Sequence, residues 1–142
     1  MAAGYAVLRF NFRGVGGSEG SYDGGDGEVD DFLAAVQAAP ELTQVPVGLV
    51  GGYSFGAMMA LAGYERSEAS NLVLVAPPLR LGGQSVTPDA SMLVMLGTRD
   101  DIVPVEETAT HFSAANVVRI EGADHFFFGY GDDLQRAVAE FA

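Results

Sequence analysis

The sequence contains no cysteine and no lysine, and all seven of its basic residues are arginines. The absence of cysteine excludes disulfides, thiol catalysis and zinc–thiolate sites. Nineteen acidic residues against seven basic ones give a formal net charge of −12 at pH 7. Such a surface repels phosphate backbones and anionic lipid headgroups, so neither nucleic acid nor a membrane surface is expected as a partner.

The N-terminus has neither a basic start nor a cleavable apolar stretch, so it does not predict a signal peptide, and we expect a cytoplasmic protein. Residues 45–64 form an uncharged stretch of twenty residues, which is the length of a membrane span. The stretch contains Pro46, five glycines and Ser54, however, and a buried strand, a sharp turn and a buried helix would give the same string. The membrane interpretation is therefore disfavoured.

The 142 residues predict a single domain, 1–142, without a repeat or a linker. Hydrophobic residues make up 49% of the chain and charged residues 18%, which is typical of a globular protein and not of a disordered one. A domain of this length buries roughly 70% of the surface that its unfolded chain exposes, which is enough for one hydrophobic core.

Five apolar runs predict β-strands, and helical patterns separate them. Continuous apolar runs indicate burial on both faces, as in a parallel sheet between two layers of helices. The expected strands are residues 5–12, 47–53, 71–76, 91–97 and 116–120. The expected helices are residues 28–39 (ended by Pro40), 55–64, 105–114 and 132–141. This alternation predicts an α/β fold with a doubly wound, mainly parallel sheet of about five strands flanked by helices.

The segment Gly52-Tyr53-Ser54-Phe55-Gly56 matches G-x-S-x-G, a pattern that places a nucleophilic serine on a strained turn between a strand and a helix. It follows the second apolar run directly, and ligands of open α/β sheets bind beyond the carboxyl ends of the strands. Ser18 matches the same pattern, but the glycine-rich stretch after it cannot begin a helix. The alternative for Ser54 is an ordinary tight turn.

The segments after two later strands contain the partners that a serine nucleophile needs. Asp100 and Asp101 follow the fourth run, and either could hold a histidine in one tautomer, the other being a turn or helix-cap residue. His125 follows the fifth run and could accept the serine proton as a general base. The other histidine, His111, is explained by a surface position or by the dipole at a helix C-terminus.

With these motifs the chain resembles the α/β-hydrolase superfamily, in particular its small, cap-less bacterial members. The resemblance covers nearly the whole chain and rests on residues 11–20 (NFRGVGGSEG), 52–56 (GYSFG), 97–104 (GTRDDIVP) and 123–127 (ADHFF). The order Ser54, Asp100, His125 is the chain order of the triads in that family. The resemblance implies Asp100 as the acid in place of Asp101, and it makes Ser18 part of a loop beside the active site.

The resemblance also implies several strands before residues 5–12, so the expected architecture is an α/β-hydrolase fold lacking its N-terminal strands. In the family, the loop after the last of those strands donates one backbone N–H to the oxyanion hole. Here the N–H of Phe55 is the expected donor, and Gly14 and Val15 in the glycine-rich loop are candidates for the second. The gap between residues 5–12 and 47–53 would close by direct pairing or by a second chain, and we therefore expect a homodimer.

The expected function is hydrolysis of small carboxylic esters through an acyl-serine intermediate. Residues 77–90 are only a loop, too short for a lid, so we expect a shallow site that favours short acyl chains. An apolar acyl pocket could be lined by Phe126, Phe127, Phe128, Met58 and Leu79. Core packing is an equally open explanation for two of the three phenylalanines, and amide or thioester substrates would use the same triad.

The alternative function is that of a non-catalytic interaction module. The glycines at positions 14–27 give no G-x-G-x-x-G in register after a strand, and the acidic residues 23–31 lack the spacing of a calcium loop. We therefore expect no cofactor and no metal.

Overall fold

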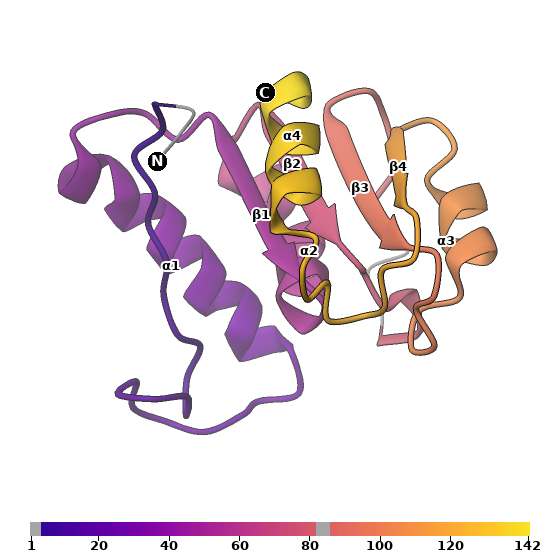
Figure 1. Cartoon of the computed structure of the whole chain (residues 1–142). Helices are drawn as coiled ribbons and strands as arrows, with labels where there is room; N and C mark the ends of the chain where they lie inside the picture. The colour runs from indigo at the N-terminus through magenta and orange to yellow at the C-terminus, as the bar shows by residue number, and fades with distance from the viewer. Residues whose placement is uncertain (1–3, 82–85) are drawn as a thin grey trace.

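The computed structural model describes residues 4–81 and 86–142 and shows a parallel β-sheet with helices on both faces (Figure 1). In this part of the chain the sheet has four strands in the order β1-β2-β3-β4, and all neighbouring strands are parallel. The strands are β1 (Leu49–Tyr53), β2 (Asn71–Val75), β3 (Met92–Gly97) and β4 (Asn116–Ile120). The helices are α1 (Asp26–Thr43), α2 (Phe55–Ser67), the short 3₁₀ helix η1 (Leu79–Leu81), α3 (Val105–His111) and α4 (Gly131–Phe141).

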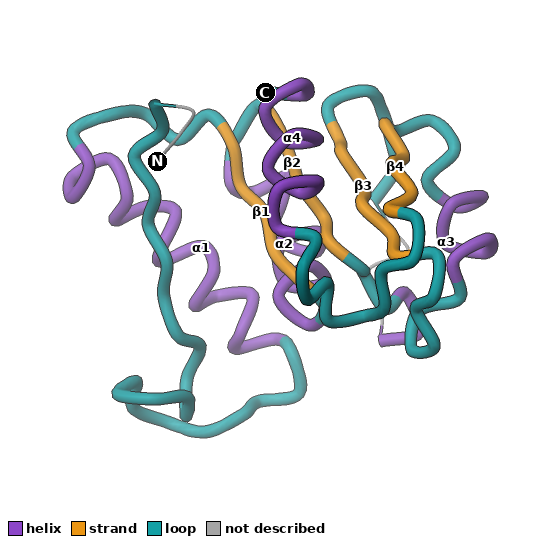
Figure 2. The backbone as a smooth tube through the Cα atoms, in the orientation of Figure 1, coloured by secondary structure: helices purple, strands orange, loops and turns teal. Residues whose placement is uncertain are grey.

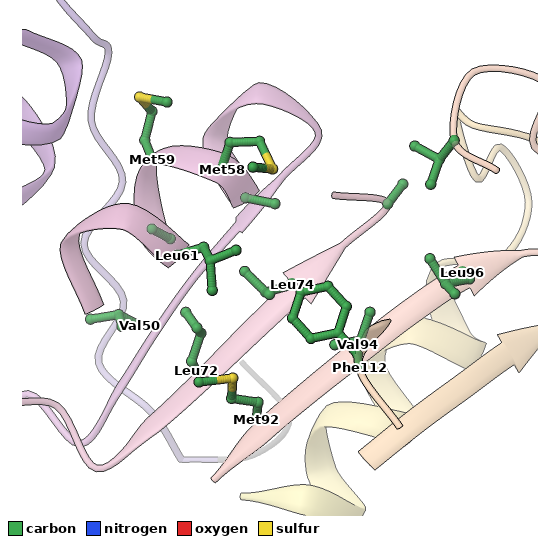
Figure 3. Packing of buried hydrophobic residues seen from close by; sticks show 14 of the residues in the cluster. Val50, Met58, Met59, Leu61, Leu72, Leu74, Met92, Val94, Leu96 and Phe112 are labelled. Carbon is green, nitrogen blue, oxygen red and sulfur yellow. The ribbon is translucent and has the colours of Figure 1, made fainter. Parts of the chain in front are cut away.

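Two hydrophobic cores lie on opposite faces of the sheet, because successive side chains of a strand point to opposite faces. The larger core joins the sheet to α2 and to the end of α3, and it includes Leu61, Leu72, Leu74, Met92, Val94 and Phe112 (Figure 3). The smaller core lies under α4 and contains Val73, Leu93, Met95 and Ala137. Every residue of β3 is buried. The doubly wound α/β fold predicted from the continuous apolar runs is therefore confirmed.

Residues 45–64, which have the length of a membrane span, contain β1 and most of α2, a partly buried strand followed by a largely buried helix. Among the described helices, none combines the length and the apolar character that crossing a membrane requires.

Residues 5–12, predicted to be the first strand, form an extended loop without a partner in the sheet (Figure 2). No strand of the described sheet pairs with the segment, and the side chains of Tyr5, Val7 and Phe10 are 43%, 66% and 39% exposed. Strand propensity expresses how well a side chain fits a paired, half-buried surface, and in the described sheet this segment is paired with no strand. The expected direct pairing with β1 does not occur, so β1 is an edge of the described sheet.

Helix α1 continues to Thr43 and includes Pro40, where the sequence predicted its end. Proline removes one backbone donor, but the last turn is closed by other bonds. The backbone N–H of Gln44 donates to Pro40 O at 3.0 Å, and Thr43 Oγ1 donates to Ala39 O at 2.7 Å. The other boundaries lie within three residues of those predicted.

Candidate active site

Ser54 lies on the turn between β1 and α2, at the carboxyl end of the sheet. Its backbone has φ 52° and ψ −118°, a strained conformation for a residue with a side chain. The turn is held in place because the backbone N–H of Ser54 donates to Val75 O at 2.9 Å. Gly52 is required here, since a Cβ at this position would collide with the backbone of Gly56. The strand–turn–helix context predicted for Ser54 is therefore present.

His125 is brought to the serine by the loop between β4 and α4. Its Nε2 lies 2.9 Å from Ser54 Oγ, and its side chain is only 6% exposed. Its Nδ1 lies 2.8 Å from Asp100 Oδ2. Because a carboxylate only accepts, Nδ1 carries the hydrogen, and in the neutral imidazole Nε2 then accepts from the serine hydroxyl.

Asp100 lies in the turn after β3, with its side chain 1% exposed. One oxygen, Oδ2, faces His125, and the other, Oδ1, accepts from the backbone N–H groups of Ile102 and Val103 at 2.8 Å each. The adjacent Asp101 is exposed. Of the two aspartates that the sequence left as alternatives, the structure places Asp100 against the histidine.

Two aromatic rings enclose the imidazole of His125. The Tyr53 ring lies against it with centroids 5.4 Å apart, and the Tyr53 hydroxyl donates to the backbone oxygen of His125 at 2.9 Å. Partial burial, followed by the negative charges of Asp100 and Asp124, raises the pKa of Tyr53 above its ordinary value of 10.0. The phenol therefore stays protonated and can donate at neutral pH. Sequence reasoning missed this contact, and its only signal was a tyrosine directly before the serine.

The second ring is that of Phe126, which meets the imidazole edge-on at 5.7 Å. The three consecutive phenylalanines have different environments, since Phe127 is 6% exposed whereas Phe126 and Phe128 are 59% and 83% exposed. Core packing thus accounts for one of the three phenylalanines. Met58 is 1% exposed and lies within the core, so it does not line an open pocket.

The loop before α1 packs against Phe55, the residue after the serine. Phe12 and Tyr22 meet the Phe55 ring edge-on at 5.5 Å and 6.1 Å. As the first residue of α2, Phe55 has a backbone N–H without an acceptor inside the helix. An N–H in this position can donate to an oxyanion formed at Ser54.

The amides of the other two predicted oxyanion donors are already used within their own loop. The N–H of Gly14 donates to Glu19 O at 3.1 Å, and that of Val15 donates to Phe12 O at 3.1 Å. These bonds argue against the role expected for Gly14 and Val15, because a donor bound to a loop carbonyl is not free for an oxyanion.

Ser18 lies in the same glycine-rich loop and has a structural contact. Its hydroxyl donates to the backbone oxygen of Asn11 at 2.9 Å. The second G-x-S-x-G match is therefore part of a loop turn and not an elbow between a strand and a helix.

An ion pair ties this loop to α1. The guanidinium of Arg13 donates to both carboxylate oxygens of Asp31, at distances from 2.8 to 3.2 Å. The side-chain hydrogen bond from Arg13 lowers the pKa of Asp31. The buried carboxylate of Glu28 accepts from the backbone N–H groups of Asp23 and Gly25, at 2.9 and 2.8 Å. Burial alone would raise the pKa of Glu28, but these backbone donors lower it.

Within residues 4–81 and 86–142, no group of three or more histidine, aspartate or glutamate side chains is arranged to hold a metal ion. His111, the second histidine, ends α3, and its ring meets Phe112 edge-on at 4.9 Å.

A model of the alpha/beta hydrolase family matches residues 1–93, which include the serine elbow. The chain belongs to this family. An uncharacterized protein of Rickettsia prowazekii (strain Madrid E) is 31% identical over 158 aligned residues, which cover 97% of this chain and 65% of the relative.

Two solved structures from bacteria share the fold and a third of the sequence. An alpha-beta serine hydrolase homologue from Coxiella burnetii has a TM-score of 0.84 at 34% identity, over 93% of this chain and 66% of that one. A serine hydrolase without a lid from Xanthomonas campestris has a TM-score of 0.85 at 34% identity, over 94% of this chain and 63% of that one. The predicted resemblance to small, cap-less members is confirmed, and the chain spans about two thirds of the length of these relatives.

Proposed function

We propose that this chain is a serine hydrolase that cleaves small carboxylic esters through an acyl-serine intermediate. The observation that carries the proposal is one continuous hydrogen-bonded chain, from Ser54 Oγ through both ring nitrogens of His125 to Asp100. The likeness to two serine hydrolase structures at 34% identity supports it. The expected partner is therefore a small-molecule ester.

The geometry supports a two-step reaction. Ser54 Oγ attacks the ester carbonyl while His125 Nε2 takes its proton, and Asp100 stabilises the imidazolium that forms. The carbonyl electrons return, the bond to the alcohol oxygen breaks, and the imidazolium gives its proton to that oxygen. Water then attacks the acyl-serine with the same base, releasing the acid and restoring Ser54.

The negatively charged oxygen of the tetrahedral intermediate accepts a hydrogen bond from the backbone N–H of Phe55. Losing one donor from an oxyanion hole typically costs about 10²–10³ in turnover. Because the amides of Gly14 and Val15 are bonded within their loop, we expect modest turnover from this chain.

The decisive experiment compares hydrolysis of p-nitrophenyl acetate by the parent chain, Ser54→Ala and Ser18→Ala. Ser18 is the matched control, because it satisfies the same sequence pattern without a base beside it. We expect hydrolysis by the parent and by Ser18→Ala, and none above background by Ser54→Ala. If the parent is inactive, or Ser54→Ala retains its activity, the proposal fails and the interaction-module alternative replaces it.

We also propose that the chain forms a homodimer through the edge of β1. An edge strand presents unpaired backbone donors and acceptors that can recruit another chain. Here the outer edge of β1 has no partner strand in the described sheet, and apolar side chains of residues 5–12 are exposed. Light scattering at micromolar concentration should give twice the mass of the chain, and the mass of a single chain would refute the dimer.

A cytoplasmic location is proposed from the sequence, and cell fractionation would test it.

A further inference from the structure

Two exposed phenylalanines stand together beside the histidine. The rings of Phe126 and Phe128 are stacked, with centroids 6.1 Å apart and planes 21° from parallel. Their neighbour Phe127 turns inward with φ 52°, so the backbone presents the outer two rings on the same side. Single exposed apolar residues are common, but a stacked pair of exposed rings next to a reactive group calls for a function.

The chemistry of the proposed reaction tells which part of an ester comes near this pair. His125 Nε2 must return its proton to the oxygen of the departing alcohol, so that oxygen has to come within hydrogen-bonding distance of Nε2. The group attached to this oxygen therefore lies on the histidine side of the site. Phe126 meets the imidazole edge-on at 5.7 Å and is 59% exposed, so an exposed aromatic ring lies on this side of the site.

The acyl part of the ester belongs to the other side. Its carbonyl carbon becomes bonded to Ser54 Oγ, and its oxygen faces the N–H of Phe55. The aromatic neighbours there are Phe12 and Tyr22, which contact Phe55 and come from the loop before α1. The two ends of the substrate thus meet different aromatic groups, contributed by different segments of the chain.

We propose that Phe126 and Phe128 form a binding subsite for the alcohol part of the substrate and select uncharged aromatic alcohols, such as a benzyl group. The proposal rests on the esterase function proposed above. A flat ring of the substrate can stack on this exposed pair. Its binding is then favoured by the aromatic contact as well as by burial of apolar surface. Asp124 accepts from the N–H of Phe126 at 2.9 Å, and its charge together with the net charge of −12 disfavours anionic alcohols.

The test uses two acetates, benzyl acetate and ethyl acetate, which share the acyl group and differ in the alcohol. Phe128→Ala is the main variant, because Phe128 is 83% exposed and contacts Phe126 and not the imidazole. The benzyl-to-ethyl ratio of kcat/KM should fall about 2–12-fold, the range that one aromatic contact supplies. Phe126→Ala should lower the same ratio, with a further loss on both esters from its contact with His125.

Leu42→Ala is the control for removal of an exposed apolar side chain. Leu42 is 68% exposed near the C-terminal end of α1, which leads to the amino ends of the strands and away from the site. It should leave the ratio unchanged. The ratio of ethyl butanoate to ethyl acetate, which reports on the acyl part, should also be the same in Phe128→Ala and in the parent.

The inference fails on its own if the parent hydrolyses the esters through Ser54 but Phe128→Ala leaves the benzyl-to-ethyl ratio unchanged or alters the acyl ratio instead. The inference is also overturned if the parent chain sediments with phosphatidylcholine vesicles, Phe128→Ala does not, and the ester ratios are unchanged. That result would assign the two phenylalanines to binding of a lipid surface. If Ser54→Ala is as active as the parent, or the parent cleaves neither ester, the proposed function fails and the subsite falls with it.

Discussion

Replacing Asp100 by asparagine tests the proton arrangement of the site with a change of one functional group. In the parent, Oδ1 is fixed by the N–H groups of Ile102 and Val103, and Oδ2 faces His125 Nδ1. Asparagine has one oxygen and one NH₂ group. If its oxygen keeps the two backbone donors, the NH₂ group faces Nδ1. The imidazole must then carry its hydrogen on Nε2, which cannot accept the proton of Ser54.

The size of the effect follows from the alternative in which the asparagine flips. The flip restores the productive tautomer but turns the NH₂ group against two backbone donors. An unpaired buried donor costs about 1–3 kcal/mol, with less expected for Ile102, which lies nearer to solvent than Val103. A cost of about 2–4 kcal/mol corresponds to roughly 30- to 10³-fold in rate. Since the charge that stabilises the imidazolium is also lost, we expect kcat/KM to fall about 10²–10⁴-fold.

The assay is hydrolysis of p-nitrophenyl acetate at pH 7 and above, with urea unfolding to show that Asp100→Asn is folded. Asp101→Asn is the matched control: it removes the same charge one residue away, from an exposed side chain. It should stay within a factor of about two of the parent, as surface substitutions usually do. A loss of less than about tenfold in Asp100→Asn, or an equal loss in Asp101→Asn, would refute the reasoning.

Two further predictions concern the supports of the site. Tyr53→Phe keeps the ring beside His125 but removes the bond to its backbone oxygen, so urea unfolding should show a loss of about 0.5–1.5 kcal/mol. The rate of ester hydrolysis should fall as well, because the bond helps to position His125. Unchanged stability would contradict a stabilising role for this hydrogen bond. Because the pKa of Glu28 is lowered on folding, its contribution to stability is present above its ordinary value of 4.5 and is lost as the pH falls through the lower folded value. Glu28→Gln should therefore reduce the acid-induced loss of stability between pH 5 and 3, measured by urea unfolding, and an unchanged pH profile would contradict it.

Much of the fold could be predicted because short stretches of the sequence carry the patterns of its strands and helices. The run that became β3 is apolar throughout and β2 is apolar after Asn71, which is what a strand buried between two helical layers requires. The residues of the candidate triad could be found from the same pattern, because they follow strands at the carboxyl edge of one parallel sheet. Choosing Asp100 over Asp101 needed either the family resemblance or the structure, since both follow the same strand.

The remaining features depend on contacts between distant segments. Residues 5–12 have the composition of a strand, yet they have no partner in the described sheet, and composition alone does not supply one. Gly14 and Val15 could be judged as oxyanion donors only once their bonds to Glu19 and Phe12 were known. Tyr53 and His125 are 72 residues apart in the chain, so no local pattern could connect them.

The arrangement of the sheet also explains why the three residues of the candidate triad can lie together while β1 lies at an open edge. Ser54 follows β1, Asp100 follows β3 and His125 follows β4, and these strands are joined into one sheet through β2 by continuous parallel pairing. The positions of the three side chains are therefore set by the register from β1 to β4. A strand added at the outer edge of β1 would leave this register unchanged. The geometry of the candidate triad should thus be insensitive to whether that edge pairs, whereas an oxyanion donor contributed from beyond that edge would depend on the pairing.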